Sequence, residues 1–119
     1  MTTPLHYGKQ QIEADDVQAV VDTLQSDFLT QGPHVHQFES AIAHYVCSRY
    51  AVACCNGTAA LHIACMALGI TKGDEVWTSP ISFVASANCA LYCGASIDFI
   101  DIDPPTGNIS LPALTQKLA

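Results

Sequence analysis

The sequence has 119 residues, of which 50% are hydrophobic and 13% are charged, and its net charge is −7 at pH 7. This hydrophobicity excludes a disordered chain, and the length allows one domain at most. Its four cationic residues are scattered singly and form no basic stripe, so neither a nucleic acid nor an anionic membrane surface is expected as a partner.

The apolar segments and the cysteines indicate where in the cell the protein is expected to lie. The apolar runs are too short to cross a bilayer, and the first eleven residues lack the basic start and apolar segment of a signal peptide. The six cysteines lie in apolar segments, and no second pair completes a metal site with Cys89 and Cys93. We therefore expect buried structural thiols, no metal and a cytoplasmic location.

The first part of the chain is expected to be helical. Residues 1–12 are typical of an irregular arm. A helix is predicted from Ala14 because apolar residues follow at helical spacing, namely Val17, Val20, Val21 and Leu24. Residues 26–33 interrupt the pattern, and a second helix is then indicated by Val35, Phe38, Ile42 and Tyr45.

The period then changes to alternating strands and helices. The predicted strands are 50–55, which is apolar enough for burial on both faces, 75–78 and 95–102. The predicted helices are 59–68, one from Ser82 or Phe83 to about Tyr92, and one from Leu111 onward. This order predicts an α/β fold with a mostly parallel sheet, and three strands suggest the opening part of a larger protein.

The segment Asn56-Gly57-Thr58 is the strongest local signal. It joins a predicted strand to the N-terminus of a helix, where unpaired N–H groups and the helix dipole favour a phosphate group. Asn and Thr are also common helix caps, so the segment is open to a purely structural interpretation.

Phe83 follows the next predicted strand, and the carboxyl ends of parallel strands meet at one edge of a sheet. Its ring is therefore expected near Gly57 and Thr58, where it can stack on a planar ligand, unless it is a core residue of its helix. Weaker candidates receive structural interpretations: His62 as a core histidine, His34 and His36 on different sides of a helix, and Asp98, Asp101 and Asp103 as strand-end or turn residues.

The motifs resemble the DegT/StrS-type sugar aminotransferases along nearly the whole chain. The matching segments are 26–33, 38–39, 56–62, 67–70, 73–76, 79–88, 92–95 and 101–104. Within that family, residues 7–10 and 89–94 are similar to transaminases of the pseudaminic acid pathway.

This resemblance implies the aspartate-aminotransferase fold (fold type I), pyridoxal 5'-phosphate as cofactor, and a homodimer. Carried over by position, Gly57 and Thr58 would hold the cofactor phosphate and Phe83 would stack on its ring. Thr30, Gln31 and Tyr7 would lie at the sugar-nucleotide site. The expected division is 1–33 as arm, first helix and loop, and 34–119 as the incomplete start of the large, cofactor-binding domain.

The family's Schiff-base lysine matches none of Lys9, Lys72 and Lys117, so no catalytic residue is expected among these residues, which we interpret as an N-terminal portion. The implied reaction transfers an amino group from glutamate to a UDP-linked 4-keto-6-deoxy sugar. Two alternatives stay open: a related sugar dehydratase, and a non-catalytic piece that offers only a partial phosphate site or a dimerisation surface.

Overall fold

The computed structural model describes residues 8–119, so Tyr7 lies outside the described part of the chain. These residues form two compact units, divided in the sequence between Val52 and Ala53, and each unit is described separately. In the described part of the chain, no helix combines the length and apolar character needed to cross a membrane.

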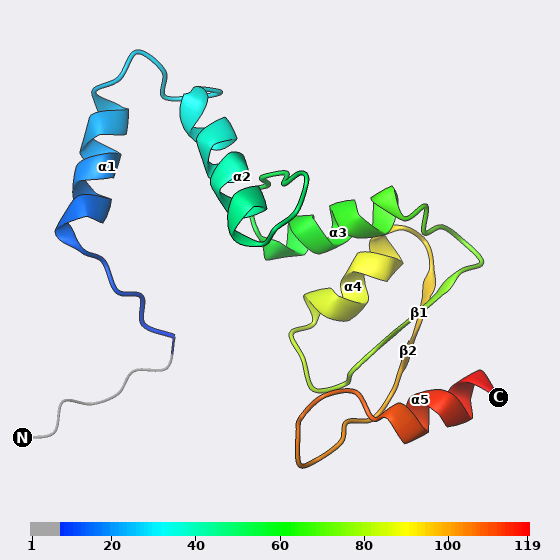
Figure 1. Ribbon diagram of the computed structural model, residues 1–119. Helices are drawn as coiled ribbons and strands as arrows, with labels where there is room; N and C mark the ends of the chain where they lie inside the picture. Colours follow the sequence, from blue (N-terminus) through cyan, green and yellow to red (C-terminus); the bar gives the residue numbers. More distant parts are fainter. Residues whose placement is uncertain (1–7) are drawn as a thin grey trace, which may run out of the picture. The chain divides into compact units, whose positions relative to one another are not determined.

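The first unit, up to Val52, contains the helices α1 (Ala14–Leu24) and α2 (Pro33–Tyr45) (Figure 1). The start of α1 is fixed by its first turn, where the Glu13 N–H donates to the Asp16 carboxylate at 2.9 Å. Pro33 occupies the first turn of α2, where its missing N–H costs nothing. None of residues 8–52 is buried, so the apolar stripes of both helices face outward.

The second unit, from Ala53, contains α3 (Gly57–Ala67), β1 (Glu75–Thr78), α4 (Ala85–Tyr92), β2 (Ser96–Phe99) and α5 (Leu111–Leu118). The two strands are parallel, with register running from Glu75 opposite Ser96 to Thr78 opposite Phe99. Helix α4 connects them, packs on both strands and also contacts α3 (Figure 1). This β–α–β arrangement confirms the predicted α/β fold.

The core of this unit is built mainly from small side chains. Its members come from α3, α4 and the segment around β2, and they are Cys65, Ala85, Ala87, Cys89, Ala90, Ala95 and Ile100. Small residues on α4 let its backbone approach α3 and the sheet closely. At the rim of this contact, the His62 and Tyr92 rings meet edge to face, with centroids 5.3 Å apart.

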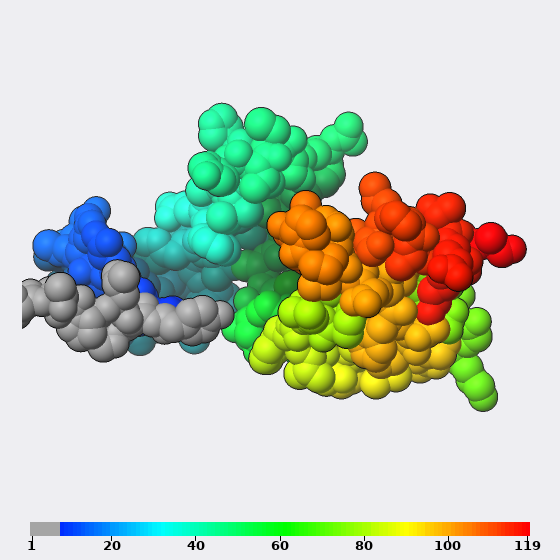
Figure 2. All heavy atoms as spheres, turned by 90° about the horizontal axis from the view of Figure 1, so that it is seen from below, coloured from blue at the N-terminus to red at the C-terminus, as the bar shows by residue number. Residues whose placement is uncertain are grey.

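Helix α5 is tied to the sheet through Lys117. Its ammonium group forms an ion pair with the Asp98 carboxylate, donates to the Phe99 carbonyl at 3.4 Å and lies 5.0 Å from the centroid of the Trp77 ring. In Figure 2 the red atoms of α5 lie against the yellow and orange atoms of the strand region. One side chain thus connects α5 to both strands.

Several sequence predictions need correction. Residues 50–55 form no strand, and Tyr50, Val52, Cys54 and Cys55 are exposed, because no described segment supplies a ladder of hydrogen bonds to them. Cys47 is exposed as well, so the expectation of buried thiols holds for Cys65 and Cys89 only, with Cys93 half-buried. The last strand ends at Phe99, short of the predicted residue 102.

Candidate functional site

The N-terminus of α3 offers free hydrogen-bond donors. Asn56 is its N-cap: its side-chain oxygen accepts from the Ala59 N–H at 2.9 Å, and its carbonyl accepts from the Ala60 N–H at 3.1 Å. Within residues 8–119, the N–H groups of Gly57 and Thr58 and the Thr58 hydroxyl have no partner. Asn56 therefore does the capping, and Thr58 is not the cap that the structural interpretation allowed.

Gly57 leaves room for an anion at this end of the helix. A Cβ atom built on Gly57 would meet nothing within 4 Å. Two adjacent N–H groups and a hydroxyl thus lie at the positive end of the dipole of α3, beside the open space over Gly57. Such an arrangement can bind a phosphate group through its oxygen atoms.

Phe83 lies in the loop before α4, and its side chain is 74% exposed. The interpretation of Phe83 as a core residue of its helix is therefore wrong, because α4 begins two residues later, at Ala85. The ring borders a cleft of about 190 Å³, formed by the ends of β1 and β2 and the start of α4. The lining includes Phe99 of β2 and four residues that carry hydroxyl groups, namely Thr78, Ser79, Ser82 and Ser86.

The packing of α3 on α4 brings these two features into one unit. Figure 1 shows both helices beginning on the same side of this unit. Gly57 and Thr58 begin one helix, and Phe83 precedes the other. Gly57, Thr58 and Phe83 are thus brought to the same side of the unit by the starts of two helices, and the predicted strand 50–55 takes no part in this.

Thr30 and Gln31 lie in the other unit, in the loop between α1 and α2, and both are exposed. Gln31 has a φ of 54°, a left-handed conformation that is uncommon outside glycine. The loop is held by Ser26, whose hydroxyl donates to the Thr23 carbonyl at 2.8 Å. A Cβ on Gly32 would come within 2.9 Å of the Phe28 Cβ, so this turn requires a glycine there.

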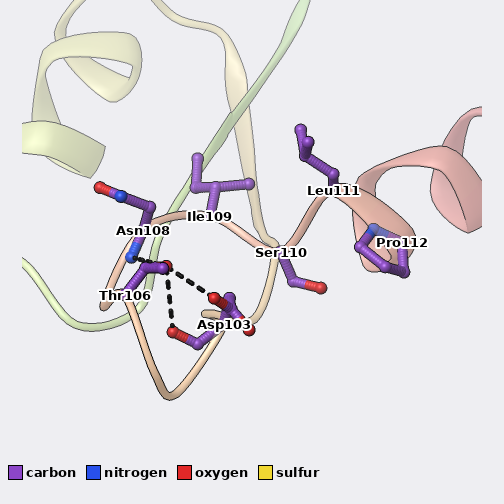
Figure 3. Close-up of a pocket in the computed structure, with 7 residues that line it drawn as sticks. All are labelled: Asp103, Thr106, Asn108, Ile109, Ser110, Leu111 and Pro112. Carbon is purple, nitrogen blue, oxygen red and sulfur yellow. Dashed lines mark hydrogen bonds between the residues drawn. The ribbon is translucent and has the colours of Figure 1, made fainter.

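A larger pocket, about 520 Å³, lies elsewhere, at the loop that leads into α5 (Figure 3). Its polar groups bind one another: the Thr106 hydroxyl donates to the Asp103 carboxylate at 2.7 Å and accepts from the Asn108 N–H at 3.3 Å. The Ser110 hydroxyl is occupied in capping α5, where it accepts from the Ala113 N–H. This pocket therefore offers few free ligand groups, and Asp103 is a turn residue as the sequence indicates.

The titratable groups of the described residues do not form a second reactive centre. Burial, together with the neighbouring Cys89 thiol, raises the pKa of the Cys65 thiol, which makes it less reactive. Among residues 8–119, no three His, Cys, Asp or Glu side chains gather in an arrangement that could hold a metal ion. Of the lysines, Lys117 is engaged by Asp98, and Lys72 lies exposed in a turn.

Sequence reasoning missed the serines around Phe83. The hydroxyls of Ser82 and Ser86 lie 3.1 Å apart and share a hydrogen bond. The spacing of four residues between Ser82 and Ser86 could have predicted this contact, because side chains four positions apart lie close together in a helical turn.

Comparison with known proteins gives the family. A sequence model of the DegT/DnrJ/EryC1/StrS aminotransferase family matches residues 10–119. The spore coat polysaccharide biosynthesis protein SpsC of Bacillus subtilis is 45% identical over 88% of this chain and 27% of its own length. A UDP-4-amino-4,6-dideoxy-N-acetyl-beta-L-altrosamine transaminase of Campylobacter jejuni is 40% identical over 94% of this chain and 29% of its own length.

Solved structures agree with this assignment. PseC of Helicobacter pylori, an aminotransferase of pseudaminic acid biosynthesis, superposes with a TM-score of 0.86 at 33% identity, over 93% of this chain and 30% of its own. A sugar aminotransferase of Streptococcus pneumoniae, solved in PLP and PMP forms, superposes at 0.84 and 29% identity, over 89% of this chain and 27% of its own. Pyridoxal phosphate is thus the cofactor of the Streptococcus relative.

The chain spans less than a third of the length of these relatives. The predicted α/β fold and the predicted family are both confirmed over this span. The chain belongs to the DegT/DnrJ/EryC1/StrS aminotransferase family.

Proposed function

We propose that the protein containing this chain is a pyridoxal-phosphate-dependent aminotransferase that acts on a UDP-linked 4-keto-6-deoxy sugar, with glutamate as amino donor. The observation that carries this proposal is the pair of free N–H groups at the start of α3, in a chain that belongs to an aminotransferase family. A cytoplasmic homodimer is part of the proposal.

The residues of α3 fit the phosphate of this cofactor. Gly57 and Thr58 would donate their N–H groups, Thr58 would add its hydroxyl, and the open space over Gly57 would admit the phosphate oxygens. Asn56 would keep the donors in place, because its cap fixes the first turn of the helix.

The ring of Phe83 fits the planar part of the cofactor. Its large exposed face is free for stacking, which places and orients an aromatic ligand. When bound, pyridoxal phosphate would supply an electron sink for moving an amino group. The residues of this chain would bind and orient the cofactor, whereas proton transfer is assigned to none of them.

The nature of the sugar substrate is supported by the names of relatives. The Campylobacter relative is named for a UDP-linked 4-amino-4,6-dideoxy sugar, and PseC is described as an aminotransferase of pseudaminic acid biosynthesis. Thr30 and Gln31 are exposed and available for the sugar nucleotide, with Gln31 held in its left-handed conformation. Tyr7 is proposed for the same site, on the resemblance alone.

A different nucleotide is the second candidate, because a GDP-perosamine synthase of Caulobacter vibrioides is 45% identical over 70% of this chain and 22% of its own length. The experiment uses the protein encoded by the complete reading frame that contains these residues. It is mixed with pyridoxal phosphate, glutamate and either a UDP-linked or a GDP-linked 4-keto-6-deoxy sugar, and 2-oxoglutarate and amino sugar are measured.

We expect both products in equal amounts with the UDP-linked sugar. Turnover with the GDP-linked sugar alone would contradict the proposed substrate but would still support the proposed amino-group transfer. Loss of the sugar's hydroxyl without amination would indicate the dehydratase. Failure to bind pyridoxal phosphate would contradict the proposed function and favour a non-catalytic role.

A further inference from the structure

The loop that carries Phe83, residues 79–84, is tied down at both ends by serines. Ser79 directly follows β1, and its side-chain oxygen accepts from the Ile81 N–H at 3.2 Å. At the other end, Ser82 shares its hydroxyl hydrogen bond with Ser86. Phe83 lies between these two contacts, next to Ser82.

Ser86 holds this loop through two different atoms. Its N–H donates to the Phe83 carbonyl at 3.0 Å, and its hydroxyl meets the Ser82 hydroxyl at 3.1 Å. Ser86 itself is held in place, because its neighbours Ala85 and Ala87 are buried in the core of the unit. Its carbonyl accepts from the Cys89 thiol at 3.4 Å. Ser86 therefore connects a rigid helix to the loop.

The Phe83 ring cannot rely on packing for its position, because its side chain is largely exposed. Functional side chains are held by packing and by supporting hydrogen bonds, so a ring with little packing depends more on the hydrogen bonds that fix its loop. The contacts that fix the backbone of Phe83 are those made by Ser86, directly at its carbonyl and through Ser82 on the preceding residue.

We infer that Ser86 is a positioning residue for Phe83, and that its hydroxyl orients the stacking ring through Ser82. This inference rests on the proposed function, in which Phe83 stacks on the cofactor. Ser86 acts on the cofactor only through the loop and makes no contact with it. The hydroxyl pair thus holds the residue before Phe83, while the Ser86 N–H holds the Phe83 carbonyl, and together they fix the backbone from which the ring projects.

The test uses the complete protein, and its main readout is the dissociation constant of pyridoxal phosphate, measured by titrating the cofactor-free protein. We expect Ser86→Ala to weaken binding by about threefold to tenfold, which is the effect of one lost hydrogen bond. We expect Ser82→Ala to weaken it equally, and the double variant to be no weaker than either single one, because both remove the same bond.

Three comparisons separate positioning from other roles. Ser86→Thr keeps a hydroxyl and should keep the affinity. In the Phe83→Leu background, Ser86→Ala should cause no further loss, since the ring it orients is absent. Without cofactor, Ser86→Ala should accelerate hydrogen exchange of the amides in 79–84 but not in α3. Ser40→Ala, an exposed serine on α2, is the matched control and should change none of these.

Each result is decisive. Additive losses for Ser82 and Ser86, or a loss that persists in the Phe83→Leu background, would show direct contact with the cofactor and overturn the inference. If Ser86→Ala fails to fold, Ser82→Ala in the exposed loop carries the same expectation. If the unaltered protein binds pyridoxal phosphate and only Phe83→Leu weakens it, the inference alone is wrong. If the unaltered protein does not bind it, the proposed function is wrong as well.

Discussion

At the scale of single residues, the start of α3 assigns helix capping and ligand binding to two different residues, which the sequence alone does not distinguish. Asn56 satisfies the Ala59 N–H of the helix, whereas the Thr58 hydroxyl binds nothing within the described chain. A group without a partner in the protein is available to a ligand, and its removal costs the fold little. The two residues should therefore respond differently to substitution.

We expect Thr58→Ala to weaken pyridoxal phosphate binding with little change in melting temperature, because a hydrogen bond to a charged phosphate contributes about 1.5–3 kcal/mol. We expect Asn56→Ala to lower the stability by about 1 kcal/mol, through loss of the cap. Cofactor titration and thermal unfolding of the complete protein measure the two effects. A destabilised Thr58→Ala variant with unchanged cofactor affinity would contradict the phosphate role.

At the scale of elements, three helices end in the same way, with a residue of positive φ just beyond the cap. Gly69 after α3 and Gly94 after α4 have φ values of 75° and 80°, and each is followed by a bond back to the helix. Cys47 after α2 has a φ of 53°, with bonds from its own N–H to the His44 carbonyl and from the Ser48 N–H to the Ala43 carbonyl. This is a Schellman motif that lacks its usual glycine.

We expect Cys47→Gly to stabilise the protein by about 0.5–1 kcal/mol, because relief of the left-handed strain exceeds the added entropy of the unfolded chain. Gly69→Ala should instead lower the free energy of unfolding, by about 1–2 kcal/mol, because it introduces the same left-handed strain. Urea denaturation measures both. Cys47→Ala is the control, since it removes the thiol and keeps the strain. Equal gains from Cys47→Ala and Cys47→Gly would mean that strain is not the cause.

The elements also show what sequence patterns can and cannot predict. The apolar spacing after Ala14 and the short run at β1 gave correct elements, because each pattern depends only on neighbouring residues. Residues 50–55 have the composition of a buried strand but form none, because a strand requires a ladder of hydrogen bonds to a distant partner strand. For the site, the pattern located Phe83 beyond β1, whereas its exposure depends on where α4 begins and on the Ser82–Ser86 contact.

At the scale of the whole molecule, Lys117 provides a test of how α5 is held to the sheet. Its hydrogen bond lowers the pKa of the Asp98 carboxyl below the ordinary value, with further help from the Phe99 N–H. A carboxyl with a lowered pKa in the folded state stabilises the fold above its unfolded pKa, and this contribution is lost as the pH falls through the folded value.

We therefore expect Asp98→Asn to reduce stability at pH 7, by a small amount because the pair is exposed to solvent, and to have no effect well below pH of about 4. Urea unfolding of the complete protein at several pH values measures this difference. Asp27→Asn, which removes an exposed carboxylate from a loop, is the matched control. A deficit for Asp98→Asn that persists at pH 2 would exclude the ion pair as its cause.

The last prediction concerns residues 1–119 expressed alone. On α1, the apolar residues Val17, Val20 and Leu24 are 54%, 60% and 64% exposed, and none of residues 8–52 is buried. Apolar faces of this size favour association with other chains. We expect sedimentation to show self-association that weakens in Val20→Glu and persists in Gln18→Glu, a change on the polar face. We also expect no amination of a UDP-linked keto sugar, since the resemblance matches none of these lysines to the catalytic one. A soluble monomer would contradict the first expectation, and any turnover above a no-protein control would contradict the second.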